Sequence, residues 1–221
     1  MSRRVPTRWF NSTVLGIGMA SLFSDLRHET VTSLMPALLA SMGGAAGALG
    51  TIEAVSDGLS SVAKLYGGWW TDRLNRRKPL CATGYGAMAA ATAIIASAAT
   101  WPIVLAGRSL AWVARGLRTP ARKALMAEAV TPETYGRAFG FERTLDTLGA
   151  VIAPLAAISL LRIGLRERQV LWFSVLPAFI ATAAIIFLVR GTVNRKPAFH
   201  PLLTSLRGLP GNFIPFLRGV G

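Results

Sequence analysis

The 221-residue sequence has little charge, a single cysteine and two histidines. Asp, Glu, Lys and Arg make up 15% of it, against about 25% in a typical soluble domain. With only Cys81, no internal disulfide can form, and Cys81 with the scattered His28 and His200 matches no metal or redox spacing. The sequence also lacks a phosphate-binding loop and a Ser or Cys nucleophile with a plausible base. We therefore expect neither an enzyme nor a bound metal or cofactor.

Two long stretches contain no charged residue at all, residues 79–107 and 170–189. A membrane-spanning helix needs about 20 such residues. The net charge of +14 would indicate nucleic-acid binding in a soluble protein. Here the basic residues lie beside the apolar stretches, as orientation in a membrane requires. The sequence therefore predicts an all-α membrane protein whose partner is the lipid bilayer, with no role for nucleic acid.

Six transmembrane helices fit the chain, as a bundle over residues 1–190. They are expected at about residues 9–40, 46–70, 80–98, 103–124, 138–161 and 170–189. The first apolar stretch is too long for a signal peptide and holds charged residues, so we expect it to stay in the mature protein. Residues 191–221 are expected to be a cytoplasmic linker that leads toward a further span.

Lys and Arg are unevenly divided between the two sides of this bundle. The N-terminal segment, the connection after the second helix, residues 115–143 and the tail carry 18, whereas the three connections on the other side carry 3. Basic residues are retained on the cytoplasmic side. We expect a multi-pass protein of the plasma (inner) membrane with both termini in the cytoplasm.

Several ionisable residues fall inside the predicted spans, where a charge is costly and marks a functional candidate. Their spacing places the acids on one face of the first and second spans and the bases on one face of the fourth. These residues are Asp25 and Glu29, Glu53 and Asp57, and Arg108, Arg115, Arg118 and Arg122. Acidic and basic faces that oppose each other can pair and offset the cost of desolvation.

Two interpretations of these charges are open. In the functional one, a carboxylate binds and releases a proton as a cavity opens to each side of the membrane. Asp25 and Glu29 near mid-span, and Arg108 deep in the fourth span, favour this interpretation.

In the structural interpretation, the charges form ion pairs between helices or reach the membrane surface. We expect the basic residues near the cytoplasmic ends of their spans to reach the surface in this way: Lys64, Arg118, Arg122 and Lys123. Glu53 and Asp57 fit either interpretation equally well.

A dense basic segment, Gly67–Lys78, lies between the second and third spans. Its charges cannot sit in hydrocarbon, so we predict a short loop at the membrane surface. The pattern Gly-x-x-x-Asp-Arg-x-x-Arg-Arg is formed by Gly68, Asp72, Arg73, Arg76 and Arg77. It resembles the loop between helices 2 and 3 of the major facilitator superfamily of secondary transporters. Asn75 replaces the usual Gly and tolerates the same left-handed backbone.

The resemblance implies the N-terminal half of a twelve-helix transporter, built as two three-helix units related by an inverted repeat. It also implies a gating role for the basic segment. Asp72 would pair with Arg115 or Arg118 at the cytoplasmic end of the fourth span and would face a helix N-terminus of the other half.

Two further motifs bear on the branch of the superfamily. Arg108 matches the Arg that begins the family's helix-4 motif, but Ala111 and Trp112 replace the Gln and Gly that follow. The fifth span is similar to the Gly-x-x-x-Gly-Pro motif of the exporter branch, and its motif residues are Asp146, Gly149 and Pro154. Ala153 replaces the second Gly of the motif, and the closing Gly-Gly is absent. Small residues and proline permit close helix approach and a bend. The resemblance favours a proton-driven exporter.

We therefore expect a small-molecule transporter that works by alternating access, with the first and fourth spans lining a cavity near the membrane midplane. The proton-motive force would drive efflux by antiport. Six helices supply only one wall of the cavity, so a second half or a second copy in a homodimer is required. The alternative is a non-transporting binding or regulatory subunit of the membrane, or an inactive truncated product.

Overall fold

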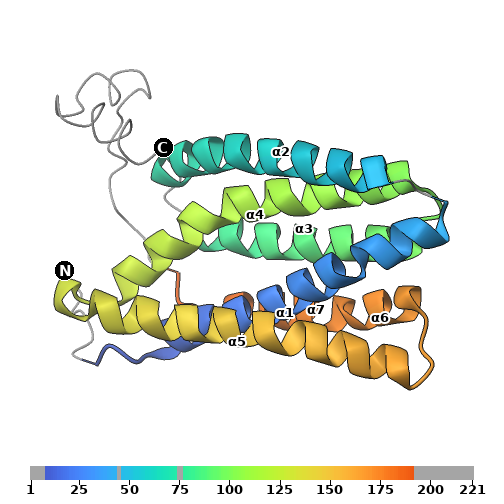
Figure 1. The fold of residues 1–221 in the computed structure, drawn as a ribbon. Helices are drawn as coiled ribbons and strands as arrows, with labels where there is room; N and C mark the ends of the chain where they lie inside the picture. Colours follow the sequence, from blue (N-terminus) through green and yellow to red (C-terminus); the bar gives the residue numbers. More distant parts are fainter. Residues whose placement is uncertain (1–7, 44–45, 74–76, 192–221) are drawn as a thin grey trace, which may run out of the picture.

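The computed structural model describes residues 8–43, 46–73 and 77–191. This part of the chain contains helices and no strands (Figure 1). The elements are α1 (Ser12–Ser41), α2 (Ala46–Arg73), α3 (Arg77–Ser97), α4 (Trp101–Ala129), the 3-10 helix η1 (Pro132–Thr134), α5 (Tyr135–Arg162), α6 (Glu167–Phe173) and α7 (Val175–Leu188). The predicted all-α class is confirmed for these residues. The predicted linker lies almost wholly outside them.

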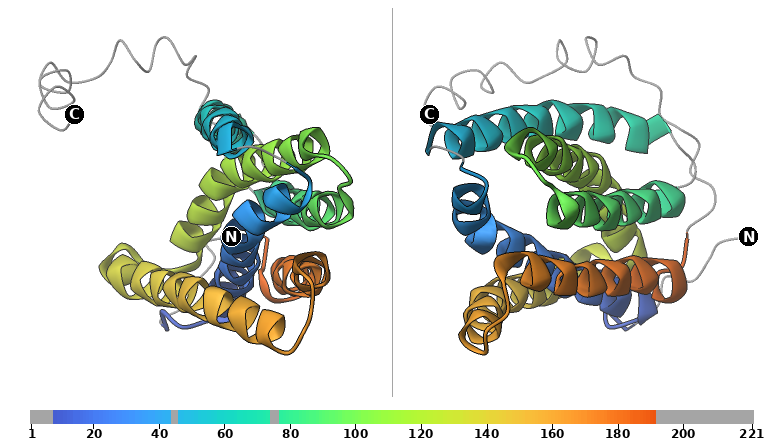
Figure 2. Two further views of the ribbon diagram at one scale, coloured as in Figure 1. Left: turned by 45° about the vertical axis from the view of Figure 1, so that its right-hand side comes forward. Right: turned by 90° about the vertical axis from the view of Figure 1, so that its right-hand side faces the viewer.

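The long helices run side by side in two layers (Figures 1 and 2). One layer holds α2, α3 and α4, and the other holds α1, α5, α6 and α7. Within the layers, α4 packs against α2 and α3, while α1 packs against α5 and α7. Contacts of α3 with α7 and of α1 with α4 join the layers. α1 and α4 therefore meet between the two layers.

The sixth predicted span consists of two consecutive helices, α6 and α7, which are separated at Ser174. Pro177 has no N–H, and its ring would clash with the carbonyl of Phe173, four residues earlier. The helix is interrupted between Phe173 and Val175, where the Phe173 carbonyl has no N–H of Pro177 to accept from. The Ser174 hydroxyl donates to the Leu171 carbonyl over 2.6 Å, which satisfies one acceptor at the break.

The prediction that Gly67–Lys78 is a loop is wrong at both ends. α2 continues through Arg73 and α3 begins at Arg77, while residues 74–76 lie outside the described part. At Gly67 a Cβ would stand 2.8 Å from the Leu117 Cα of α4, so this glycine lets α2 keep packing against α4. Basic residues at a helix C-terminus are also favoured by the helix dipole. The charge therefore marks the end of the helix rather than a loop.

Three helical stretches of the described chain are long and apolar enough to cross a membrane: Arg77–Ser97, Pro132–Arg162 and Glu167–Leu188. α1, α2 and α4 have sufficient length, with 30, 28 and 29 residues, but they carry more charge. Large apolar side chains cover the outside of the bundle, among them Leu65 on α2, Leu155 on α5 and Phe187 on α7. This is the arrangement expected of a surface that faces lipid.

Candidate functional site

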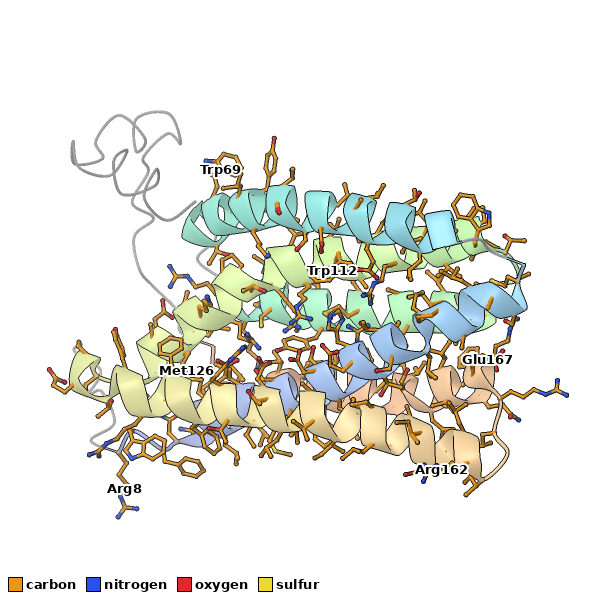
Figure 3. All side chains as sticks on the ribbon, viewed as in Figure 1. Arg8, Trp69, Trp112, Met126, Arg162 and Glu167 are labelled. Carbon is orange, nitrogen blue, oxygen red and sulfur yellow. The ribbon has the colours of Figure 1, made fainter. Side chains whose placement is uncertain are left out.

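A cluster of charged side chains lies inside the bundle, between α1 and α4. Figure 3 shows polar side chains gathered between the layers, with Trp112 inside the bundle and Arg8, Arg162 and Glu167 at its ends. The most buried charged members are Asp25 and Arg27 from α1 and Arg108 and Arg118 from α4, each less than a tenth exposed. We call these residues and their ion-pair partners the central cluster.

Two ion pairs of the central cluster join α4 to α2 and to α1. Arg108 Nη2 lies 3.1 Å from Glu53 Oε1 and donates to Thr32 Oγ1 over 3.1 Å. Arg115 Nη2 lies 3.3 Å from Asp25 Oδ1. The basic face of α4 thus meets the acidic faces of α1 and α2, so that part of the charge is compensated inside the bundle.

Arg118 and Arg122 do not reach the membrane surface, contrary to the prediction. Arg118 is 2% exposed and donates to Ser24 Oγ over 2.8 Å. Arg122 Nη1 lies 3.0 Å from Glu142 Oε1 of α5 and also donates to Ser21. Ser21 and Ser24 are small enough to admit the guanidinium groups and polar enough to accept from them, which holds these arginines inside.

Other predicted cavity residues lie at the margin of the cluster or beyond it. The side chain of Glu29 is 35% exposed, and its carboxylate is 4.0 Å from His28 Nε2. Asp57 is exposed on α2, and among the described residues no ion pair joins its carboxylate to the cluster. Asp25, Arg108 and Glu53 are thus brought together, whereas Asp57 is not.

The proposed gate is described only in part. Gly68 lies in α2, while the side chains of Asp72 and Arg73 and the whole of Arg76 fall outside the described part. The pairing of Asp72 with Arg115 or Arg118 therefore stays a prediction. Within the described chain, these two arginines contact Asp25 and Ser24 instead.

Arg77 of the basic segment forms an ion pair with Glu128 at the end of α4. It also donates to the Thr71 carbonyl of α2 over 3.4 Å. Sequence reasoning missed Glu128, which lay in a predicted loop. Arg77 thus ties the start of α3 to the ends of α2 and α4 at the bundle end where the basic segment lies.

The α5 motif lies against α1. A Cβ at Gly149 would stand 2.3 Å from the Leu22 carbonyl oxygen, so the two backbones are in direct contact. Asp146 is 6% exposed and accepts from Arg143 Nη1 over 2.8 Å, while Pro154 lies within α5.

Sequence reasoning did not single out Arg27 or Trp112 as site residues. Arg27 is 1% exposed and donates from Nη1 to Thr92 Oγ1 over 3.0 Å. The Trp112 ring centroid lies 5.6 Å from Arg108 Cζ and 5.5 Å from Arg115 Cζ, within range of cation–π attraction. The available signals were an arginine in an apolar span and a tryptophan where the resemblance leads one to expect glycine.

A narrow pocket opens beside these two residues. It is lined by Arg27, His28, Met88, Ala111, Trp112 and Arg115. Side chains of α1, α3 and α4 thus meet at one place inside the bundle. The pocket combines cations, an aromatic ring and small apolar groups. It is too narrow here to admit a water molecule, so its side chains must move apart before a ligand can enter.

Sequence comparison relates the chain to known carriers. Residues 14–218 match the profile of the Major Facilitator Superfamily. The chain is 24% identical over 192 residues to an uncharacterized MFS-type transporter of Methanocaldococcus jannaschii, covering 86% of this chain and 47% of the relative. It is 28% identical over 194 residues to an uncharacterized protein of Mycobacterium tuberculosis, covering 86% and 46%. The chain spans about half the length of these curated relatives.

Solved structures share the fold. A peptide transporter POT in complex with sulfate superposes with a TM-score of 0.74 at 15% identity, covering 98% of this chain and 46% of that one. The human organic anion transporter MFSD10 superposes with a TM-score of 0.68 at 18% identity, covering 87% and 49%. At these identities the likeness establishes the arrangement of helices and nothing more.

Proposed function

The chain belongs to the Major Facilitator Superfamily, and from this premise we propose that it forms one half of a secondary transporter for a small molecule. It is an integral, multi-pass membrane protein and a carrier rather than an enzyme. The observation that carries the proposal is the central cluster. Ionisable side chains inside a membrane bundle are costly to retain and mark substrate or ion pathways.

In the proposed mechanism the pathway follows the α1–α4 side of the bundle and opens alternately to each face of the membrane. Two three-helix units, α1–α3 and α4–α7, would be related by an inverted repeat. The packing supports this arrangement. In this repeat, α1 corresponds to α4, α2 to α5, and α3 to α6–α7. The α1–α5 contact then has its counterpart in the α4–α2 contact, and the α1–α7 contact in the α4–α3 contact.

The second wall of the pathway would come from another half: a second copy of this chain, a separately encoded half, or a continuation of this chain. The chain spans about half the length of its curated relatives, which supports the need for such a partner. The start of α1, the end of α2, the start of α3, the α4–α5 connection and the end of α7 lie at one end of the bundle (Figure 1). Because most Lys and Arg residues flank these segments, we place that end and both termini in the cytoplasm, with the protein in the plasma (inner) membrane.

Energy would come from the proton-motive force, in the direction of efflux. Asp25 is the proposed proton carrier, because its carboxylate is buried on α1 and its partner Arg115 lies on α4 at 3.3 Å. Protonation would release Arg115 and loosen the contact between the two helices. Glu29, one turn away and more exposed, would pass the proton to the cavity.

Asp25→Asn is expected to reduce proton-coupled transport at least tenfold, because the amide cannot carry a proton and attracts Arg115 more weakly. Everted membrane vesicles with a respiration-driven pH gradient would be exposed to a panel of small molecules while the gradient is followed with a fluorescent amine. Asp25→Glu, which keeps a titratable carboxylate, should recover part of the response. Equal activity of Asp25→Asn and the natural protein would reject Asp25 as the carrier. Folded protein without a response to any compound would favour the non-transporting subunit.

A further inference from the structure

We propose that the pocket between α1, α3 and α4 binds a small oxyanion, a carboxylate or phosphate group, and that the substrate is therefore an anionic molecule. That this anion is a substrate rests on the proposed function, whereas the binding of the anion does not. The argument begins with the charges inside the bundle.

The central cluster holds more positive than negative charge. Arg108 and Arg115 of the cluster, and Arg122 further along α4, each have a carboxylate within ion-pair distance. Arg27 and Arg118 are 1% and 2% exposed, and no carboxylate of the described chain lies within 4.0 Å of either. A buried charge without an opposite charge nearby is strongly destabilising. A bound anion would therefore lower the free-energy cost of burying these two guanidinium groups.

Arg27 has a free edge for such an anion. Its Nη1 donates to Thr92, whereas its Nε and Nη2 have no acceptor among the described residues. These two nitrogens form one edge of the guanidinium plane, with two parallel N–H groups. That edge matches the two oxygens of a carboxylate or phosphate.

The other unsatisfied groups of the pocket are also donors. Trp112 Nε1 and Arg115 Nη1 are buried without acceptors, although Arg115 Nη2 is paired with Asp25. Both residues line the pocket together with Arg27. Three side chains on two helices thus present N–H groups for which the described chain supplies no acceptor. An oxyanion satisfies such a set, whereas a cation would meet only like charge.

The test is saturable binding to the purified full chain in detergent, measured as a rise in the unfolding temperature. The probes are inorganic phosphate and succinate, with chloride at equal ionic strength and the neutral diamide of succinate as controls. We expect phosphate or succinate, but neither control, to raise the unfolding temperature. A response to phosphate alone would identify a phosphate compound, and a response to succinate alone a carboxylate.

Variants separate this pocket from other basic sites. Arg27→Gln should weaken binding at least tenfold, because a hydrogen-bonded charge is lost. Trp112→Phe keeps an aromatic ring but removes the indole N–H donor, and should weaken binding about threefold to tenfold. Arg137→Gln, at an exposed position on α5, should bind as the natural protein does. The unfolding temperature of each variant without anion is measured first, so that a folding defect is recognised.

Two results would overturn the inference: no saturable response to either oxyanion, or equal responses in the natural protein and in folded Trp112→Phe and Arg27→Gln. Either result would mean that the pocket does not hold the anion. The binding experiment and the vesicle transport assay test different claims, so one can fail while the other succeeds. Anion binding without transport would uphold the site and reject the transporter, whereas transport of only neutral or cationic compounds would uphold the transporter and reject an anionic substrate.

Discussion

Glu142→Gln is expected to lower the free energy of unfolding by about 3–5 kcal/mol, because it leaves the Arg122 guanidinium buried without a carboxylate. The two side chains are 14% and 13% exposed, with Arg122 Nη1 3.0 Å from Glu142 Oε1. Ser21 of α1 donates to Glu142 over 2.7 Å and accepts from Arg122. One carboxylate therefore organises contacts of α1, α4 and α5.

Thermal unfolding in detergent, followed by size-exclusion chromatography after heating, measures this effect. The double variant Arg122→Gln with Glu142→Gln removes both charges and should recover most of the lost stability. Glu133→Gln makes the same chemical change at an exposed position on η1, where the carboxylate has hydrogen bonds but no buried cation, and should lower the unfolding temperature far less. If Glu142→Gln stays within about 0.5 kcal/mol of the natural protein, the pair is not a structural contact.

Gly149→Ala is expected to destabilise the protein by about 1–3 kcal/mol. The added Cβ would lie 2.3 Å from the Leu22 carbonyl oxygen and 3.0 Å from the Leu26 nitrogen. Both are backbone atoms of α1, so no side chain can turn away to make room. α5 must move away from α1, and the close packing between the two helices is lost.

Gly140→Ala is the matched control on the same helix, because a Cβ there meets nothing within 4 Å. Alanine is the better helix former, so this change should stabilise the protein by about 0.5–1 kcal/mol. The two substitutions are therefore expected to shift the unfolding temperature in opposite directions. Shifts of the same sign would show that the α1–α5 contact is looser than 2.3 Å implies.

The helices were largely predictable, because apolar stretches of membrane length leave few alternatives to helix. Their ends were harder to predict. Charge density in Gly67–Lys78 predicted a loop at the membrane surface and did not reveal the end of α2, which depends on how Gly67 packs against α4. The break at Ser174 depends on the position of Pro177 relative to the carbonyl four residues earlier, a local signal that composition does not reveal.

The sequence predicted which helix faces carry the charged residues of the candidate site, but not which side chains contact one another. Helical spacing correctly placed Arg108, Arg115, Arg118 and Arg122 on one side of α4. It did not show how deep each arginine lies, because depth depends on the hydroxyl groups that α1 presents to Arg118 and Arg122. Arg27 was overlooked because its importance comes from the absence of a carboxylate nearby in space, which sequence spacing does not reveal.

The central claim, that the α1–α4 interior lines a water-filled pathway, is tested most directly by thiol labelling in membrane vesicles. Cys81→Ser removes the only cysteine, and Glu29→Cys or Phe187→Cys then adds one thiol. We predict that a membrane-impermeant methanethiosulfonate reacts at position 29, whose natural side chain is 35% exposed beside the cluster, but not at position 187, which is 82% exposed on the apolar outside of α7. An unreactive thiol at position 29, or equal labelling at both positions, would contradict the account.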